Sequence, residues 1–390
     1  MAGQPPVSTG GRDQTGSVLF GTQDTEADMT ALLLTGFPGF LGSALLPRLL
    51  ARRDGAEAIC VVQPQHLVTA TERLRAIEAE HPDVAGRTIL VTGDITQPGL
   101  GIDAAHRSAL EQVTEVWHLA AVYDLSVPER IARRVNVEGT DRVLAFCRER
   151  PALQRLQYVS TCYVSGRAGG RFTEDMLDVG QAFNNHYEAT KFEAERLVRD
   201  AMAAGLPATI YRPGVVVGDS RTGETQKFDG PYYIARFLRR QPLPVAVLPS
   251  VDEHHTFSLV PRDFVVDAMD ALSVLEVSLG RTYALTDPTP PTKRQLAETF
   301  ARHLGKRLVW VPLPLGITKA ALTTVPGLER LLGLPAEVLD YFAASTTYAT
   351  EHTVEDLAGT GVSCPPFERY AGRLLAFMER HPEIDASAMV

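Results

Sequence analysis

The segment Tyr187-Glu188-Ala189-Thr190-Lys191 places a phenol and an amine four residues apart. In a helix, that spacing puts both side chains on one face. A phenol with a pKa near 10 exchanges protons poorly at neutral pH, whereas a neighbouring ammonium favours the phenolate and lowers its pKa. Lysine is rare in this chain, with only five among 390 residues. The pattern therefore predicts that Tyr187 and Lys191 act together in proton transfer.

A second candidate for the same chemistry lies at the end of an apolar run. Residues 156–160 are typical of a strand, and the run ends on the hydroxyl residues Ser160 and Thr161. A hydroxyl at a strand end can hydrogen-bond a reacting oxygen and stabilise its developing negative charge. Thr161 is the preferred candidate and Ser160 its competitor, while the alternative is that both hydroxyls bond only the backbone. Asn136, a polar residue in an otherwise apolar helical segment, is expected to hold the site together.

A glycine-rich turn indicates what reacts beside these residues. The TGxxGxxG pattern follows an apolar run, 31–35, and opens a helical segment. Glycine is needed where the backbone takes positive φ or approaches a pyrophosphate closely, and the helix N-terminus offers free N–H groups. This context predicts a dinucleotide site. Its residues are Thr35, Gly36, Phe37, Gly39, Phe40, Leu41 and Gly42.

The position about 20 residues further on reads the 2′ group of the adenosine ribose. Here it is Gln63, at the end of the run 58–62. A carboxylate would favour NAD, but Gln63 does not repel a 2′-phosphate, and Arg52, Arg53 and Arg73 are candidate cations. The sequence therefore favours NADP(H) over NAD(H).

Other strand ends are expected to complete the cofactor site. Asp94 suits contact with the adenine, although an ordinary turn aspartate would look the same. Small residues after the fourth strand let a ribose approach, and the turn after the sixth strand lies beside the nicotinamide. These residues are Asp94, Ile95, Leu119, Ala120, Ala121, Pro213, Gly214 and Val216.

The elements that position these residues alternate between strand and helix. Strands are expected at 31–35, 58–62, 88–91, 116–121, 156–160 and 208–212, and helices at 43–53, 68–80, 131–150 and 187–204. This alternation predicts an α/β fold with a doubly wound parallel sheet and a smaller, mostly helical C-terminal substrate lobe. We expect a disordered tail at 1–28 and a nucleotide-binding domain at 29–215, to which 256–272 returns. The substrate lobe is expected at 216–255 and 273–390.

Composition excludes several classes. The net charge of −9 argues against a nucleic-acid partner. The four cysteines lack metal-ligand spacing and are expected to be buried free thiols, as suits a cytoplasmic protein. His118 has no second ligand nearby, so we expect a structural role and no metal. The apolar stretch 308–334 is interrupted by prolines and charges; peripheral membrane contact is one interpretation, and short helices lining an apolar pocket are the favoured one.

The motifs occur together in an order and spacing that resemble the extended short-chain dehydrogenase/reductase (SDR) family. The resemblance covers about 30–287 and rests on TGxxGxxG, the Gly93-Asp94 turn, HLAA, NVxGT, the strand-end Thr161, YxxxK and RPG. It implies that Tyr187 is the acid/base, that Lys191 activates it and holds the ribose, and that Thr161 hydrogen-bonds the carbonyl. Asn136 is carried over as a further catalytic residue.

Within that family, the segments around Thr161 and Tyr187 are similar to the thioester-reductase and fatty-acyl-reductase branch. A closer likeness is to a bacterial group that includes a reductase implicated in mupirocin biosynthesis. The branch usually carries Arg where this chain has Gln63. The resemblance implies NAD(P)H-dependent hydride transfer to the carbonyl of an apolar acyl thioester, aldehyde or ketone. No carrier domain is recognised, so a thioester is expected as a CoA ester or on a separate carrier protein, and a homodimer through 131–150 and 187–204 is implied.

Three other functions use similar residues. A ketoreductase or hydroxysteroid/isoprenoid-type alcohol dehydrogenase would differ only in substrate. A sugar-nucleotide epimerase would hold NAD tightly without net redox. A non-enzymatic NADP sensor tends to lose the Tyr and Lys that this chain keeps.

Overall fold

A computed structural model describes residues 31–123, 127–249, 255–311, 324 and 345–384. The predicted tail at 1–28 lies outside the described residues, and so does most of the apolar stretch 308–334. No described helix is long and apolar enough to cross a membrane.

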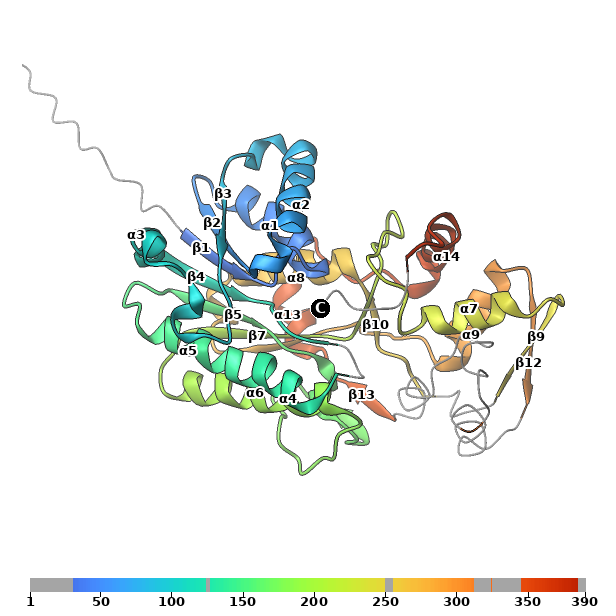
Figure 1. Cartoon of the computed structure of the whole chain (residues 1–390). Coiled ribbons are helices and arrows are strands. Elements are labelled where there is room, and N and C mark those ends of the chain that lie inside the picture. The colour runs from blue at the N-terminus through green and yellow to red at the C-terminus, as the bar shows by residue number, and fades with distance from the viewer. Residues whose placement is uncertain (1–30, 124–126, 250–254, 312–323, 325–344, 385–390) are drawn as a thin grey trace, which may run out of the picture.

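Seven parallel strands form the central sheet, which confirms the predicted doubly wound α/β fold (Figure 1). In spatial order the strands are β11 (Thr282–Leu285), β7 (Ala208–Pro213), β5 (Arg155–Val159), β4 (Val113–His118), β1 (Ala31–Thr35), β2 (Glu57–Val62) and β3 (Thr88–Thr92). The chain runs outward from β1 to β3 and then crosses back to β4. In such sheets a crevice opens at the carboxyl ends of the strands on either side of that switch, here β1 and β4.

Helices cover both faces of the sheet (Figure 1). One face packs against α5 (Gly139–Arg148) and α6 (His186–Ala203), with α4 (Glu129–Ala132) and a π-helical turn (Arg133–Glu138) leading into α5. The other face packs against α1 (Phe40–Arg52), α2 (Leu67–Glu80), α8 (Arg262–Ser273) and α13 (Glu351–Leu357), while α3 (Arg107–Glu111) precedes β4. Central strands such as β1 and β5 are buried on both faces because helices cover both faces of the sheet.

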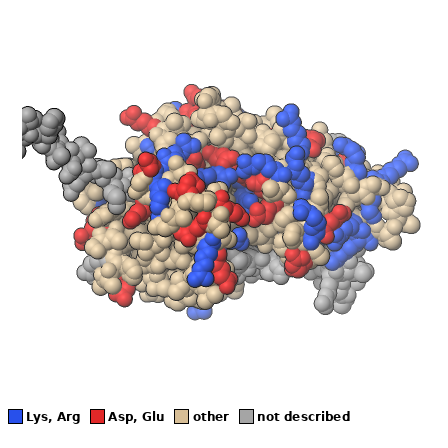
Figure 2. All heavy atoms as spheres, turned by 90° about the horizontal axis from the view of Figure 1, so that it is seen from above, with Lys and Arg blue, Asp and Glu red and all other residues tan. Residues whose placement is uncertain are grey.

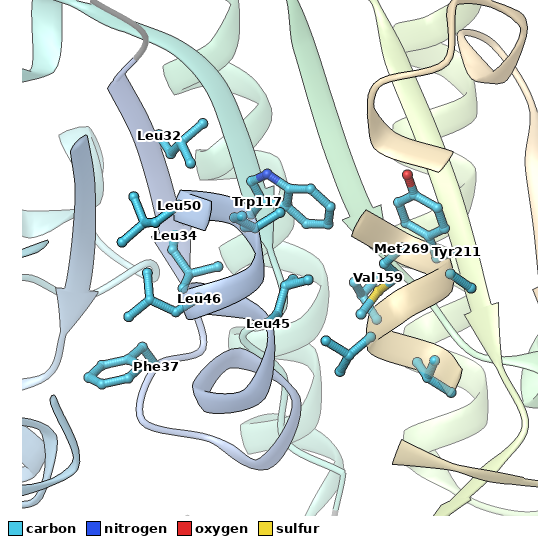
Figure 3. Close-up of a cluster of buried hydrophobic side chains, with 14 of the residues drawn as sticks. Leu32, Leu34, Phe37, Leu45, Leu46, Leu50, Trp117, Val159, Tyr211 and Met269 are labelled. Atoms are coloured by element: carbon cyan, nitrogen blue, oxygen red, sulfur yellow. The ribbon is translucent and has the colours of Figure 1, made fainter. Parts of the chain in front are cut away.

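Alternate residues of each strand supply two cores. Leu32 and Leu34 of β1 point to the α1/α8 side with Trp117 of β4 (Figure 3), whereas Leu33 packs on the α5/α6 side. All four side chains are at most 1% exposed. Full burial of such a side chain contributes about 1.5–3 kcal/mol. The register of β1, and with it the glycine turn that follows, is therefore strongly specified.

Ion pairs connect the two helices on the α1/α8 side. Arg48 of α1 contacts Asp267 of α8 at 2.5 Å, and Arg52 contacts Asp270 at 2.6 Å. Seen from above, Lys and Arg lie among Asp and Glu over the half of the molecule that contains the sheet (Figure 2). These pairs hold α1 against α8.

A smaller lobe lies beside the sheet (Figure 1). It contains α7 (Tyr232–Arg240), α9 (Lys293–His303) and α14 (Ala371–Arg380), together with a parallel ribbon of β9 (Val245–Pro249) and β12 (Arg307–Val311). Its core includes Phe228, Leu296, Phe300 and Leu374. Two further parallel ribbons pair β8 (Val215–Val217) with β10 (Leu259–Pro261) and β6 (Gly170–Phe172) with β13 (Thr346–Tyr348).

Two strands differ from the sequence prediction. The fourth strand, expected at 116–121, runs from Val113 to His118, because buried Glu115, paired with Arg53 at 3.0 Å, interrupts the apolar run that marks a strand. The stretch 273–390 was assigned to the lobe, yet β11 within it pairs with β7 as the seventh strand of the sheet. At four residues, β11 is too short to show a period in the sequence.

Candidate active site

The glycine turn after β1 is shaped by close backbone contacts. Gly36 has φ +90°, and a Cβ on it would lie 2.8 Å from the Ala120 nitrogen. A Cβ on Gly39 or Gly42 would lie 2.7 or 2.6 Å from the Gly36 carbonyl oxygen. The turn is therefore possible only with glycine at these three positions.

The helix that follows begins without a side-chain cap. Gly39 is the N-cap residue of α1, it makes no side-chain cap bond, and the first turn contains no acidic residue. The N–H groups and positive end of the helix dipole thus face the turn, an arrangement that suits an anionic pyrophosphate.

A cavity of about 930 Å³ extends from this turn to Tyr187. Eighteen predicted site residues line it. They are Thr35, Gly36, Phe37, Gly39, Phe40, Leu41, Gly42, Gln63, Ile95, Leu119, Ala120, Ala121, Thr161, Tyr187, Lys191, Pro213, Gly214 and Val216. Segments spread over the whole nucleotide-binding half thus meet at one site.

Asp94 and Asn136 do not line the cavity. The Asp94 carboxylate accepts a hydrogen bond from the Thr96 backbone at 2.9 Å, as in the ordinary turn that the sequence left as the alternative. Asn136 is buried; it accepts from the Val122 nitrogen at 2.9 Å and donates to the Val122 oxygen at 3.0 Å and to the Thr190 hydroxyl at 3.1 Å. Asn136 therefore connects the strand-end loop to helix α6 rather than facing a substrate.

His118 is also buried and connects two other side chains through hydrogen bonds. Its Nδ1 lies 2.8 Å from the Thr35 hydroxyl and its Nε2 lies 3.1 Å from the Thr140 hydroxyl. Burial, with repulsion from Lys191 as a second cause, lowers the pKa of His118 to about 3. The imidazole is thus neutral at physiological pH, in agreement with the structural role expected for it.

Lys191 lies fully inside the protein. Its ammonium donates to the Val159 carbonyl oxygen at 2.8 Å and to the Tyr158 hydroxyl at 3.2 Å. Burial lowers the pKa of Lys191 to about 8, although Glu195 acts in the opposite direction. A buried ammonium with a pKa near neutrality can exchange its proton during a reaction.

Tyr187 differs from the sequence expectation in one respect. Burial raises the pKa of Tyr187 to about 12, and the hydrogen bond with Thr161 offsets this only in part. The expected lowering by Lys191 is absent because the ammonium is bonded to Tyr158 and Val159 instead. Tyr187 is therefore a protonated phenol at neutral pH, which is the form that can donate a proton.

The two strand-end hydroxyls, of Ser160 and Thr161, have different hydrogen-bond partners. Ser160 donates to the buried Glu195 carboxylate at 2.6 Å. Arg212 holds the same carboxylate, with Nη2 2.6 Å from Oε1, and together they lower the pKa of Glu195 despite its burial. The Thr161 oxygen accepts from the Tyr163 backbone at 3.2 Å and lies beside Tyr187. Thr161 is thus the hydroxyl placed to act with Tyr187.

The residues that line the cavity at the end of β2 contradict the prediction that Arg52, Arg53 or Arg73 binds a 2′-phosphate there. Gln63 lines the cavity together with Gln65, His66 and Thr69, and Gln65 donates to Gln63 at 3.0 Å. None of the arginines proposed from the sequence lines it. Arg52 pairs with Asp270 of α8, and Arg53 pairs with Glu115 of β4. Both guanidiniums therefore bind other parts of the protein.

The other end of the cavity was not predicted from the sequence. It is lined by the aromatic residues Tyr123, Tyr163, Tyr233 and Phe257 and by the charged pair Lys227 and Asp229. These residues come from segments far apart in the chain, so no local pattern marks them. The one available signal is the rarity of lysine, which singles out Lys227 as it does Lys191.

Two relatives of known sequence are named as synthases. Over 268 residues the chain is 30% identical to one of the proteins that make up the linear gramicidin synthase of Brevibacillus parabrevis, covering 66% of this chain and 5% of that protein. Over 357 residues it is 28% identical to isonitrile lipopeptide synthase of Streptomyces coeruleorubidus, covering 87% of this chain and 24% of that protein. The chain thus spans only a small part of these relatives.

Solved structures and a family model agree with the geometry. The terminal R domain from the myxalamid PKS-NRPS biosynthetic pathway is 30% identical with a TM-score of 0.77, and the match covers 92% of this chain and 93% of that domain. A thiolation-reductase di-domain from an archaeal non-ribosomal peptide synthetase shares the fold, with a TM-score of 0.71 at 20% identity over 91% of this chain and 76% of that one. Residues 34–269 match the NAD-binding family described as "Male sterility protein". The chain belongs to this family, the thioester-reductase-like branch of the extended SDRs, and is an NAD(P)-dependent oxidoreductase.

Proposed function

We propose that this chain reduces an acyl thioester of fatty-acyl or polyketide type, delivered as a CoA ester or bound to a carrier protein, to the aldehyde. A thioester, NAD(P)H and a proton give an aldehyde, a free thiol and NAD(P)⁺. The observation that carries the proposal is the cavity in which the glycine turn meets Thr161, Tyr187 and Lys191. Its aromatic far end suits an apolar acyl chain.

When bound, the nicotinamide cofactor supplies a hydride to the carbonyl carbon. The Thr161 and Tyr187 hydroxyls hold the carbonyl oxygen and favour the negative charge that develops there. Tyr187, whose pKa of about 12 keeps it protonated, donates its proton to that oxygen, which gives a hemithioacetal. Collapse of the hemithioacetal breaks the C–S bond, and the departing sulfur takes up the hydroxyl proton, so that aldehyde and free thiol are released. The tyrosinate takes a replacement proton from the Lys191 ammonium, whose pKa of about 8 lies below that of Tyr187. Asn136 positions the helix through Thr190.

The test is consumption of NADPH and NADH by the purified chain with octanoyl-CoA, octanal and 2-octanone, with free thiol followed in parallel. We expect thiol release with octanoyl-CoA in step with cofactor oxidation. Turnover confined to the ketone would move the function to a ketoreductase, and turnover of octanal alone would move it to an aldehyde reductase.

We also propose that NADP(H) is favoured over NAD(H). No described side chain that lines the cavity at the end of β2 carries a carboxylate, and Gln63, His66 and Thr69 offer polar groups to a 2′-phosphate. Gln63→Asp is expected to shift the ratio of NADPH to NADH affinity toward NADH, about tenfold or more, by repulsion of the phosphate. Titration of protein fluorescence measures both affinities, and an unchanged ratio would place the 2′ group elsewhere.

A further inference from the structure

One buried carboxylate beside the catalytic residues has no part in the proposed reaction. Glu195 follows Lys191 by four residues on α6, and it is completely buried. The Ser160 hydroxyl donates to it at 2.6 Å, and Arg212 Nη2 lies 2.6 Å from its Oε1. A buried ion pair is often no more stable than apolar side chains of the same volume, so stability alone does not account for a carboxylate here.

Three side chains at four-residue intervals on α6 bind three consecutive residues at the end of β5. The pairs are Tyr187 with Thr161, Lys191 with the Val159 carbonyl oxygen at 2.8 Å, and Glu195 with the Ser160 hydroxyl at 2.6 Å. Side chains four residues apart share one face of a helix, so the strand end is fixed against this face of α6. The bond between Glu195 and Ser160 therefore helps to set where the next residue, Thr161, lies.

Arg212 extends this contact to β7, the strand next to β5. Besides Glu195, its guanidinium binds the Met176 carbonyl oxygen, to which it donates at 2.7 Å, and its own carbonyl oxygen accepts from the Cys162 thiol at 3.0 Å. The residue after Arg212 is Pro213, which lines the cavity. Glu195 thus connects the catalytic helix to two strand ends that border the cavity, although its own side chain does not line it.

The charge of Glu195 also acts on Lys191. Near the ammonium lie Tyr158 of β5 and His118 of β4, and both are neutral at physiological pH because burial raises the pKa of Tyr158 and lowers that of His118 to about 3. Tyr187, on the same helix, is a protonated phenol. Burial lowers the pKa of Lys191 to about 8, and Glu195 is the described charged group that acts in the opposite direction. Loss of this negative charge should therefore favour the neutral amine.

We propose that Glu195 is a positioning residue with two effects. Through Ser160 it fixes the strand end that carries Thr161, and its negative charge stabilises the Lys191 ammonium. The inference rests on the proton transfer proposed for Tyr187 and Lys191, and it adds to them a third residue of the same helix face. Neither effect requires contact between Glu195 and the substrate.

Two substitutions separate the two effects. Glu195→Gln keeps an oxygen that accepts from Ser160 but removes the charge, so the decline of kcat/KM for octanoyl-CoA above pH 8 should move to lower pH by about one pH unit. Ser160→Ala removes the bond but keeps the charge, so kcat should fall about tenfold or more while the pH of the decline stays the same. A merely structural role of Glu195 would lower kcat in both variants and move the decline in neither, and that pattern would overturn the inference.

Glu193→Gln is the matched control, because it makes the same change on the same helix. Glu193 pairs with Arg133 at 2.6 Å, where both side chains are partly exposed, and its substitution should leave the pH dependence unchanged. Since Glu195→Gln leaves Arg212 buried without its carboxylate, the double variant Glu195→Gln/Arg212→Met removes both charges. Arg212 is not among the groups that act on Lys191, so the double variant should move the decline in the same direction.

Nuclear magnetic resonance measures the protonation of Lys191 without turnover. The chain has only five lysines, so lysine labelled with carbon-13 at Cε gives few signals, and Lys191→Met identifies the one that belongs to Lys191. Its titration midpoint should lie about one pH unit lower in Glu195→Gln than in the wild type and in Glu193→Gln. Equal midpoints in Glu195→Gln and the wild type would overturn the inference. If these midpoints differ but wild-type kcat/KM does not decline above pH 8, the proposed role of Lys191 in the reaction is wrong, whereas its stabilisation by Glu195 stands.

Discussion

The stability of this fold should fall as pH decreases from 7.5 to 5 because of one buried histidine. His118 has a pKa of about 3 in the folded chain. In the unfolded chain a histidine has a pKa near 6.5. The folded-state pKa is thus depressed, so the stabilisation is present above pH 6.5 and is lost as pH falls from there toward 3. Within that window the unfolded chain takes up a proton that the folded chain cannot.

The loss can be worked out from these two pKa values. Below pH 6 the free energy of unfolding falls by about 1.4 kcal/mol per pH unit through His118, which amounts to about 2 kcal/mol between pH 7.5 and pH 5. Any folded-state pKa below about 4 gives the same value, so the prediction does not depend on the exact shift. Burial is the main cause of the low pKa, and the hydrogen bonds suit the neutral ring: Thr140 donates to the Asn136 carbonyl at 2.7 Å, so His118 Nε2 donates to Thr140 and Nδ1 accepts from Thr35. Protonation of Nδ1 would place two donors face to face.

Urea unfolding followed by tryptophan fluorescence at several pH values measures this effect, since Trp117 is fully buried beside His118. His118→Gln keeps a donor toward Thr140 but cannot titrate, so its free energy of unfolding should vary with pH about 2 kcal/mol less than that of the wild type. The solvent-exposed His81 provides a matched control, because His81→Gln removes a histidine that is hydrated in both states. Parallel pH dependences for the wild type and His118→Gln would refute the reasoning.

Three further predictions concern the reaction and the cofactor. Tyr187→Phe should lower kcat by about 10²–10⁴-fold and leave the Kd for NADPH unchanged, because only the proton donor is lost; wild-type turnover would exclude Tyr187 as the acid. Since Lys191 has a pKa of about 8, kcat/KM should decline above pH 8 as the ammonium deprotonates, and a profile that stays flat to pH 9.5 would contradict a role for its charge. Gly36→Ala should weaken NADPH binding at least about tenfold, since the new Cβ would meet the Ala120 nitrogen at 2.8 Å in a turn whose N–H groups are proposed to hold the cofactor. Gly205→Ala, at φ +99° with nothing within 4 Å, carries the same backbone strain without the clash, and equal NADPH affinities of the two variants would contradict the role of the turn.

The predicted residues that the structure brings together in one cavity are those encoded by local patterns. The glycine turn needs a strand, three glycines and a helix in succession, and Tyr187 and Lys191 need only one helix face. The predictions that fail depend on partners distant in the chain. Arg52 and Arg53 are two of the candidate cations for a 2′-phosphate, but they pair with Asp270 and Glu115 instead. These partners are recognisable only once α8 and β4 have packed against α1.

The same distinction applies to the electrostatics of the catalytic pair. The YxxxK spacing predicts that Lys191 lies near Tyr187, and both side chains line one cavity. The spacing contains no information on Tyr158 and Val159, which bind the ammonium, or on the burial that raises the pKa of Tyr187. The pKa of a buried group depends on all of its surroundings, so the proton-donating form of Tyr187 follows only from the fold.

A chain of hydrogen bonds connects the two ends of the site. Thr35, at the end of β1, bonds His118; His118 bonds Thr140 of α5; Thr140 bonds the Asn136 carbonyl; and the Asn136 side chain bonds Thr190 of α6. Every link lies between residues that are at most 2% exposed, where an unpaired polar group costs about 1–3 kcal/mol. The glycine turn begins directly after Thr35, and Lys191 directly follows Thr190. We therefore expect a displacement of the turn to strain a buried series of bonds whose last link, from Asn136 to Thr190, holds the catalytic helix.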